Sequence, residues 1–418
     1  MRNIRFFVFA CLFVCTGTQA QPFWEIYNTD NSELPDNWVN ALAVGSNLAL
    51  WVGTETGLAR LQAGGWSNWT SSSSGLPDNA VRSLAVEPGS DAVWVGTFLG
   101  GVARFDGSTW EVWNSSNSPL PENFIRDIWV EHEGRVWFGT PAGLALKEGD
   151  TWTLWNTANS DLPGNNIPAV HIDPDGTPWV GTINSGIARF NGKGWENWTI
   201  ANSDLVDNTI LDIARDTAGN LWLATPAGGL IIMTPEADFL TFNTINSGIP
   251  DNEIARIVFD SQNRGLLGMT AAGLAQFDQS SWEVYDALST NLPDNKVRAL
   301  VYAPDSSIWV GMLEGGIARW QPVDTVSGLP NSQALSALHL FPNPLSAGHA
   351  LHWRSGAAQA ALSGEGLLYS EQGQCLARAW LSAAEPFHLP EGLAPGNYVF
   401  VFQSFGRILR APLVVLAQ

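Results

Sequence analysis

Short hydrophobic runs recur along the chain with a period of about 43 residues. The runs are rich in β-branched and aromatic residues, and turn-forming segments such as DPDGT at 173–177 and DTAGN at 216–220 separate them. Four strands of ordinary length and their turns fill one such period, whereas a helix of useful length does not fit beside them. The pattern therefore predicts a repeated unit of four antiparallel strands.

Four sequence anchors recur in phase within these units, and each occurs seven times. The first reads LPDN or a close variant and begins at Leu34, Leu76, Leu120, Leu162, Leu205, Ile249 and Leu292. The second reads WVGT or a variant and begins at Trp51, Trp94, Trp137, Trp179, Trp222, Leu266 and Trp309. The third resembles GLAR, and the fourth is a pair of aromatic residues three positions apart. One four-stranded sheet cannot bury both of its faces alone, so we expect seven sheets stacked in a ring, which is a seven-bladed β-propeller of the all-β class.

The order of the anchors predicts how the ring closes. LPDN should carry the chain from the outer strand of one blade to the inner strand of the next, because proline fixes φ and Asp and Asn can bond nearby backbone. The first aromatic pair, in FWEIYN at 23–28, precedes any inner strand, and the last unit ends at Trp320 without such a pair. Residues 23–28 are therefore expected to complete blade seven and to remove an exposed edge.

The repeats resemble those of the two-component-regulator propeller family. Residues 76–113, LPDNAVRSLAVEPGSDAVWVGTFLGGVARFDGSTWEVW, carry the family's spaced anchors, and the resemblance covers roughly residues 23–322. In that family such propellers often form the sensory, extracytoplasmic part of a hybrid histidine kinase. The resemblance implies a propeller over 21–322 that recognises a ligand outside the cytoplasm.

Composition changes after about residue 322, where the chain becomes rich in Ala and Leu. The PNP motif at 342–344 and the GLAPGNY segment at 392–398 resemble the C-terminal sorting domain of the type nine secretion system. That resemblance implies a small C-terminal β-sandwich over 337–418, joined to the propeller by a linker at 323–336. It also implies the type nine secretion machinery as a partner and export through the periplasm to the outer cell surface or the medium.

Residues 1–20 have a basic start, a short apolar run and small residues at the expected cleavage site, which together predict a secretory signal peptide. The formal net charge of −20 disfavours nucleic acid and anionic membranes as partners. The apolar run is too short for a membrane span. Removal of the signal would leave Cys375 as the single cysteine, so no intramolecular disulfide is expected. We expect a monomer without a transmembrane segment.

Most residues that could carry chemistry also have a structural explanation. Tryptophan at a fixed position of the repeat favours packing between blades over sugar binding. The repeated arginines favour stacking on rings or pairing with carboxylates over an anion site; they are Arg60, Arg104, Arg189 and Arg319. Asp173 with Asp175, and Glu131 with Glu133, suit turns better than a calcium site. No nucleophile or metal motif appears, so no catalytic residue, metal or cofactor is predicted.

Positions that break the repeat are the candidate ligand site. The LPDN loops and the loops after WVGT should share one face of the ring, at the mouth of its channel. The candidate residues there are Trp38, Arg82, Phe98, Phe124, Arg126, Asn184, Arg256 and Arg298. Several cations near the axis of an acidic protein suggest a ligand site, and the competing explanation is a set of ion pairs that line a wet channel.

Three functions are compatible with this sequence. The first is a secreted or cell-surface module that binds an extracellular glycan or protein. The second is an enzyme such as a polysaccharide lyase or hydrolase, since propellers host such chemistry and a fold alone does not decide function. The third is a structural part of a surface assembly. A carboxylate, Tyr or His cluster at the mouth would favour the enzyme, whereas aromatic faces and hydrogen-bond donors would suffice for binding.

Overall fold

The computed structural model describes residues 24–321, apart from 64, 132 and 133, and eight strands between 338 and 416. The chain divides into two compact units, one of which spans Pro22–Pro322. The expected signal peptide at 1–20 and the expected linker at 323–336 lie outside the described residues. Within the described part of the chain, no helix has the length and apolar character that crossing a membrane requires.

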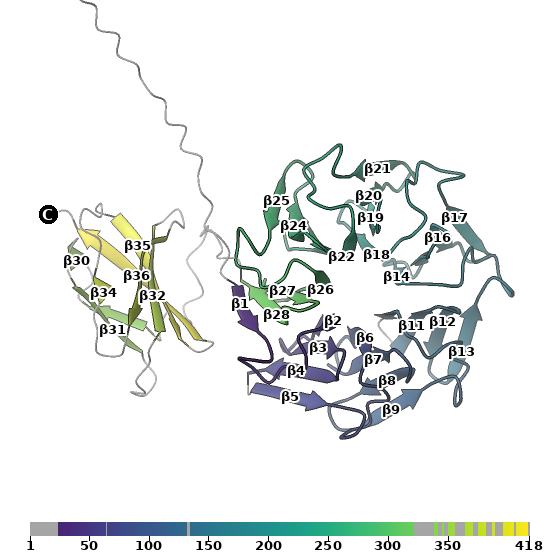
Figure 1. Ribbon diagram of the computed structural model, residues 1–418, viewed down its shortest axis with the longest axis horizontal. Coiled ribbons are helices and arrows are strands. Elements are labelled where there is room, and N and C mark those ends of the chain that lie inside the picture. The colour runs from purple at the N-terminus through teal and green to yellow at the C-terminus, as the bar shows by residue number, and fades with distance from the viewer. Residues whose placement is uncertain are drawn as a thin grey trace, which may run out of the picture. The chain divides into compact units, whose positions relative to one another are not determined.

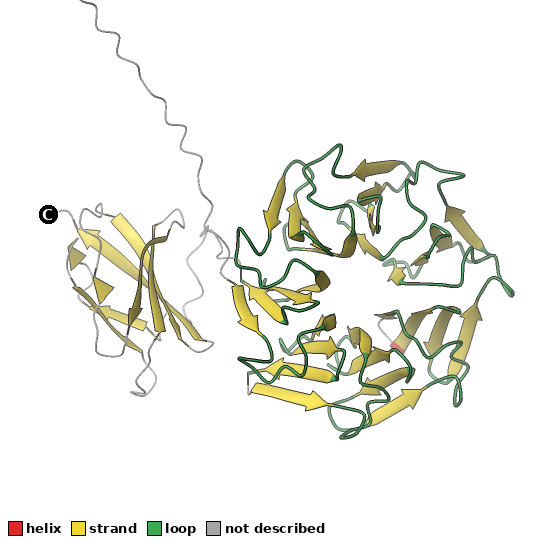
Figure 2. Ribbon diagram, in the orientation of Figure 1, coloured by secondary structure: helices red, strands yellow, loops and turns green. Residues whose placement is uncertain are grey.

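Seven four-stranded antiparallel sheets form the ring, which confirms the predicted all-β, seven-bladed propeller (Figures 1 and 2). We call the strands of each blade a, b, c and d, from the centre outward. The a strands are β2 (Val39–Val44), β6 (Val81–Val86), β10 (Asp127–Val130), β14 (Ala169–Ile172), β18 (Asp212–Arg215), β22 (Ile254–Phe259) and β26 (Val297–Tyr302). The b strands are β3 (Leu50–Thr54), β7 (Val93–Thr97), β11 (Arg135–Thr140), β15 (Pro178–Gly181), β19 (Leu221–Ala224), β23 (Gly265–Met269) and β27 (Ile308–Met312).

The outer two strands of each blade follow the same order. The c strands are β4 (Leu58–Gln62), β8 (Val102–Phe105), β12 (Gly143–Glu148), β16 (Ile187–Phe190), β20 (Leu230–Met233), β24 (Gly273–Phe277) and β28 (Ile317–Trp320). The d strands of blades one to six are β5 (Gly65–Trp69), β9 (Trp110–Trp113), β13 (Thr151–Trp155), β17 (Trp195–Trp198), β21 (Phe239–Phe242) and β25 (Trp282–Tyr285). In blade seven the d strand is β1 (Trp24–Tyr27), which pairs with β28 in antiparallel register.

The core lies between blades, because each blade is covered on both faces by its neighbours. All five residues of the b strands β3 and β7 are buried, which explains their continuous apolar sequences. Trp51 of blade one, 3% exposed, packs at a tilt against Trp69 and edge to face against Phe105 of blade two, at centroid distances of 5.4 and 6.1 Å. The glycine of WVGT lets the next blade approach, since a Cβ on Gly53 would lie 2.5 Å from Cγ1 of Val81.

The LPDN corners are held by the same hydrogen bond in all seven units. The Asn side chain accepts a hydrogen bond from the backbone N–H eight residues earlier, as in Asn79 with Ser71 at 2.7 Å. The other six pairs are Asn37 with Thr29, Asn123 with Ser115, Asn165 with Thr157, Asn208 with Ile200, Asn252 with Thr244 and Asn295 with Ala287. The corner therefore has one defined shape, and residues just after it are placed reproducibly.

The C-terminal region contains two described sheets. One has the order β29 (Leu338–Phe341), β31 (Ala350–Ser355) and β34 (Phe387–His388). The other has the order β30 (Leu345–Ser346), β36 (Arg407–Leu416), β35 (Gly396–Ser404), β32 (Gly364–Ser370) and β33 (Cys375–Leu381). These strands agree with an all-β segment after the propeller.

Candidate ligand site at the loop face

The LPDN corners and the b–c loops meet on one face of the ring, here called the loop face. Backbone hydrogen bonds join the two kinds of loop: Glu55 N–H donates to the Trp38 carbonyl at 3.2 Å, and Phe98 N–H to the Ala80 carbonyl at 2.9 Å. In blade seven Leu313 N–H donates to the Lys296 carbonyl at 3.0 Å. These hydrogen bonds hold the two kinds of loop next to each other on the loop face.

Irregular pairing at the start of four a strands turns selected side chains away from the ladder. In β6, Val81 pairs with Thr97 and Ser83 pairs with Gly96, so Arg82 is an extra residue in a β-bulge. The same shift leaves Asn40, Ala255 and Arg298 unpaired in β2, β22 and β26. A bulge re-aims the side chain of its extra residue. It is the local reason why Arg82 and Arg298 can point away from the sheets that carry them.

Two arginines and two phenylalanines of blades two and three form a continuous group. The Arg82 guanidinium lies 5.1 Å from the ring centroid of Phe98, and that of Arg126 lies 4.7 Å from Phe124. The two rings pack edge to face with centroids 4.9 Å apart. Phe98 remains 39% exposed, so the group presents an aromatic surface to solvent.

The next pair around the ring continues this arrangement. Arg298 of blade seven lies over Trp38, at the corner that enters blade one, with 5.8 Å between guanidinium and ring. Trp38 is 40% exposed and Arg298 is exposed. We call the six residues the mouth arc; they are Trp38, Arg82, Phe98, Phe124, Arg126 and Arg298.

The three cations of the mouth arc differ in how they are neutralised. Arg82 forms a bidentate ion pair with Glu55 of blade one, with nitrogen–oxygen distances of 2.7 and 2.9 Å. Among the described residues Arg126 and Arg298 have no ion pair, and the Nε of Arg126 is buried without a hydrogen-bond partner. Burial lowers the pKa of Arg126. The Arg298 side chain is exposed overall, but partial desolvation of its guanidinium, together with the charges of Arg82 and Arg256, lowers its pKa. Of the three arginines in the mouth arc, only Arg82 has its charge neutralised by an ion pair with a described residue.

Arg256 is not part of the mouth arc. Its charge acts on Asp127 and Asp212, where it opposes the rise of their pKa values. Burial raises the pKa of Asp127 to about 6, while Arg256 opposes the shift and Asp212 adds to it. Burial also raises the pKa of Asp212. Each aspartate accepts a backbone N–H from the next a strand, Asp127 from Val170 and Asp212 from Ile257, both at 2.7 Å. These carboxylates therefore connect neighbouring blades, and sequence reasoning did not identify that role.

Asn184 makes its described hydrogen bonds with Thr209 of a neighbouring loop. It lies in the b–c loop of blade four with a φ of 68°, a left-handed conformation that asparagine tolerates. The Thr209 hydroxyl accepts a hydrogen bond from the Asn184 N–H at 3.2 Å and lies 3.3 Å from its Oδ1. These contacts stabilise the loop, and none of them joins Asn184 to the mouth arc.

The residues considered for metal binding have other partners. Asp173 pairs with Arg215 and accepts the Trp179 Nε1–H at 2.9 Å, and Glu131 accepts the Trp137 Nε1–H and pairs with Arg135. Glu133 lies outside the described residues. Within the described part of the chain, no group of three or more His, Cys, Asp or Glu side chains could hold a metal ion.

Comparison with known proteins supports the fold. Residues 204–227 match the model of the two component regulator propeller family. No curated protein sequence matches the chain.

Solved structures with the same architecture share little sequence with this chain. One is the extracellular domain of a protein described as a hybrid two component system, BT3049, from B. thetaiotaomicron, with 18% identity, a TM-score of 0.62, and coverage of 95% of this chain and 58% of that one. Another is PorZ from Porphyromonas gingivalis, described as an essential surface component of the type-IX secretion system, with 15% identity, a TM-score of 0.62, and coverage of 94% and 60%. The chain therefore spans about three fifths of the length of these two structures.

A third similar structure is an enzyme. Virginiamycin B lyase from Staphylococcus aureus has 13% identity and a TM-score of 0.58, with coverage of 72% of this chain and 99% of the lyase. Identities this low establish a shared fold and leave function open. The chain has the seven-bladed propeller architecture and contains a repeat that matches the two component regulator propeller model.

Proposed function

We propose that the propeller is an extracellular recognition module that binds an acidic ligand, a glycan or a protein, at the mouth arc. The observation that carries the proposal is Arg126, a half-buried guanidinium over Phe124 with no carboxylate partner among the described residues. Desolvating a charge without a partner is costly. A carboxylate or sulfate from a ligand would supply the missing partner through a charge-assisted hydrogen bond.

The surrounding arc suits the same class of ligand. Trp38 and Phe98 offer exposed flat apolar faces beside cations. The chain as a whole carries a net charge of −20, which repels an acidic ligand at long range. Binding should therefore depend on short-range contacts within the arc. The extracellular domain and the surface component that share this fold agree with a module that works outside the cytoplasm.

Binding can be tested by changing the two unpaired cations together. The Arg126→Gln, Arg298→Gln variant should lose binding to an acidic polysaccharide such as polygalacturonate, or to a polyglutamate peptide, in a calorimetric titration. Its melting temperature should remain within a few degrees of wild type, because neither side chain has an ion pair with any described residue. Arg189→Gln is the matched control, since Arg189 is paired with Glu196 and stacked on Trp179.

The result also identifies the kind of ligand. Loss of polysaccharide binding with no peptide binding in wild type would assign a glycan, and the reverse would assign a protein. Equal binding of the double variant and wild type to whichever probe wild type binds would refute a site at the mouth arc. If wild type binds neither probe, the mouth arc does not recognise polyanions and the proposal fails.

We further propose that residues 1–20 are a signal peptide and that residues 337–418 are a type nine sorting domain removed or anchored after export. The proposal rests on the sequence resemblance and on the surface component of that system among proteins of the same fold. Intact mass spectrometry of protein from the culture medium should find a chain that begins at Gln21, much of it lacking about 80 C-terminal residues. Retention of Met1, or normal export after deletion of 337–418, would contradict it.

A further inference from the structure

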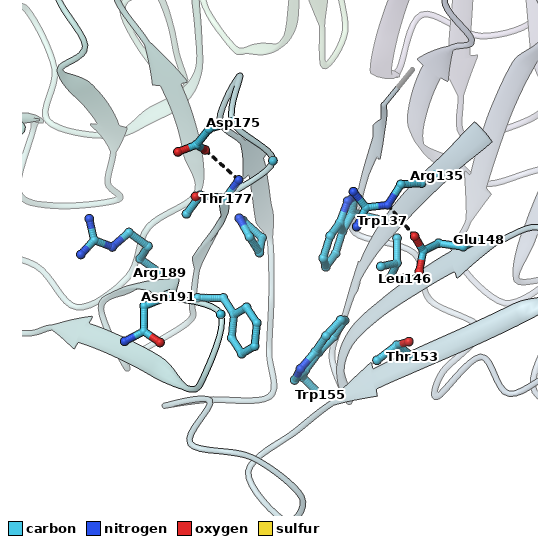
Figure 3. A pocket seen from close by; sticks show the side chains of 14 residues that line it. Arg135, Trp137, Leu146, Glu148, Thr153, Trp155, Asp175, Thr177, Arg189 and Asn191 are labelled. Atoms are coloured by element: carbon cyan, nitrogen blue, oxygen red, sulfur yellow. Dashed lines mark hydrogen bonds and ion pairs between the residues drawn. The ribbon is translucent and has the colours of Figure 1, made fainter. Parts of the chain in front are cut away.

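A slot of about 560 Å³ opens between blades three and four, in the described part of the chain and apart from the mouth arc (Figure 3). Trp137, Leu146 and Trp155 form the wall on blade three (Figure 3). Phe190, the last residue of β16 in blade four, also lines the slot. The ring centroids of Trp155 and Phe190 are 6.0 Å apart. A volume of this size is in the range of sites that hold small ligands or side chains of a partner.

The slot lies where the repeat loses an arginine. In blade one Arg60 pairs in register with Trp51, and its guanidinium lies 5.2 Å from Trp51 and 5.6 Å from Trp69. In blade four Arg189 takes the same register position opposite Trp179, with corresponding distances of 5.3 and 5.7 Å to Trp179 and Trp198. A guanidinium over both tryptophans is thus part of these two blades.

Blade three keeps both tryptophans but has Leu146 at that register position, opposite Trp137 and Thr153. Arg135, from the start of the b strand, covers Trp137 instead, at 5.8 Å. Among the described residues no cation lies over Trp155, the counterpart of Trp69 and Trp198. The half-buried Trp155 ring therefore lacks the guanidinium that blades one and four provide from their own c strands.

The charges around the slot favour a cation. Arg135 is neutralised by Glu131 and Glu148, and Arg189 by Glu196. Asp175 is exposed at the rim, where one carboxylate oxygen accepts the Thr177 N–H at 2.9 Å, and it has no ion pair among the described residues. The slot itself is lined by two arginines, Arg135 and Arg189, and by two carboxylates, Glu148 and Asp175. Because both arginines already have carboxylate partners, Asp175 is the lining charge without a counterion among the described residues. Figure 3 shows Asp175 on the side of the slot opposite the Arg135–Glu148 pair.

We infer that the slot binds an arginine side chain of a partner peptide, whose guanidinium takes the place over Trp155 that Arg60 and Arg189 take in their own blades. Cation–π contact with Trp155 and attraction to Asp175 would hold it. Strands β12 and β16, which border the slot, are each paired on both sides, so the peptide cannot bind by adding a strand. Recognition therefore rests on the inserted side chain, and it is independent of the mouth arc.

The probe is N-acetyl-Gly-Arg-Gly-amide, in which the guanidinium is the single charge, titrated against the full chain by saturation-transfer difference NMR. Its citrulline analogue keeps the shape and removes the charge. We expect the arginine peptide to bind at least about fivefold more tightly than the citrulline peptide, since cation–π contacts of this kind contribute that much or more. Equal affinity of the two peptides, or no binding of either, would overturn the inference.

Leu146→Arg restores the residue of the other blades and should fill the slot from within. We expect this variant to lose peptide binding while its melting temperature stays equal to wild type or rises. Asp175→Asn keeps an oxygen for the Thr177 N–H and should weaken binding of the arginine peptide severalfold. This second variant tests the site even if Leu146→Arg does not fold. Glu236→Gln is the control, because it removes one exposed hairpin charge in blade five and should leave affinity unchanged.

The same titration separates this site from the mouth arc. Arg126→Gln, Arg298→Gln should bind the arginine peptide as wild type does, whatever happens to acidic ligands. Undiminished peptide binding by a folded Leu146→Arg variant, or by Asp175→Asn, would place the peptide elsewhere and refute the slot as its site.

Discussion

Trp24 and Trp320 lie opposite each other in the register between β1 and β28, with ring centroids 6.1 Å apart. Trp24 is 5% exposed, and its Nε1–H donates to the Thr290 hydroxyl at 3.2 Å. The first described strand therefore contributes a buried ring and a hydrogen bond to the last blade. That contribution joins the two ends of the propeller without a covalent link.

Replacing Trp24 by Ala should destabilise the whole propeller. Removal of a buried aromatic side chain typically costs about 3–5 kcal/mol, and here it also weakens the pairing that protects the edge of β28. Chemical denaturation followed by far-UV circular dichroism measures the change in the free energy of unfolding. Trp38→Ala is the control, because Trp38 is 40% exposed and should cost about 1 kcal/mol or less. Equal losses in the two variants would contradict a closing role for β1.

Glu55→Gln should strengthen binding of an acidic ligand. Glu55 neutralises Arg82 through two hydrogen bonds, and its side chain is 32% exposed. The neutral glutamine leaves the Arg82 charge available, so affinity should rise by about two- to tenfold, while a partly exposed pair changes stability by about 1 kcal/mol or less. Glu111→Gln, which removes the exposed partner of Arg104, should leave the affinity unchanged. Weaker binding by Glu55→Gln would mean that Glu55 itself contacts the ligand.

Asp127 should make stability depend on pH in a direction opposite to that of an ion-paired carboxylate. Burial raises its pKa to about 6, so between about pH 4 and 6 the folded protein holds a proton that the unfolded chain releases. The stability associated with this group is present below that range and is lost as the pH rises through it. Arg256 and Asp212, the charged neighbours, moderate and reinforce the shift respectively.

Asp127→Asn removes this dependence and can still accept the Val170 N–H. We expect the variant to be more stable than wild type at pH 7 by roughly 1–3 kcal/mol, and the difference to shrink toward zero at pH 4. Denaturation curves of both proteins at several pH values measure the difference directly. A difference independent of pH, or a less stable variant at pH 7, would show that Asp127 is not held with a raised pKa.

The propeller was predictable because its determinants recur. Each copy of LPDN places an Asn that bonds the same backbone N–H, and six of the seven copies of WVGT have a glycine that admits the next blade, Ala224 standing in its place in the remaining copy. Seven imperfect copies in phase reinforce one another, so a substitution such as Leu266 for tryptophan does not hide the pattern. Packing within the repeat also explains Arg60, which lies over Trp51 and Trp69 as its repetition indicated.

The site was less accessible to sequence reasoning because its contacts cross between blades. The sequence places Phe98 and Phe124 in different loops, and their contact at 4.9 Å depends on the angle between blades two and three. Likewise Glu55 lies in the b–c loop of blade one and Arg82 in β6 of blade two, and their pairing depends on the bulge in β6. The slot beside Trp155 could have been anticipated from the sequence, because Leu146 occupies the repeat position at which four other units have arginine.

The central claim, that the ligand binds at the mouth arc, is tested most directly by hydrogen exchange of the full chain with and without the acidic ligand that it binds. The account predicts slower exchange in peptides that cover residues 34–44, 76–86, 96–101, 120–130 and 294–300, which hold the corners, b–c loops and bulges around the arc. Peptides that cover the a–b hairpins, such as 173–178 and 216–221, should exchange as in the free protein. Protection confined to those hairpins, with the corners of blades one to three unchanged, would contradict the account.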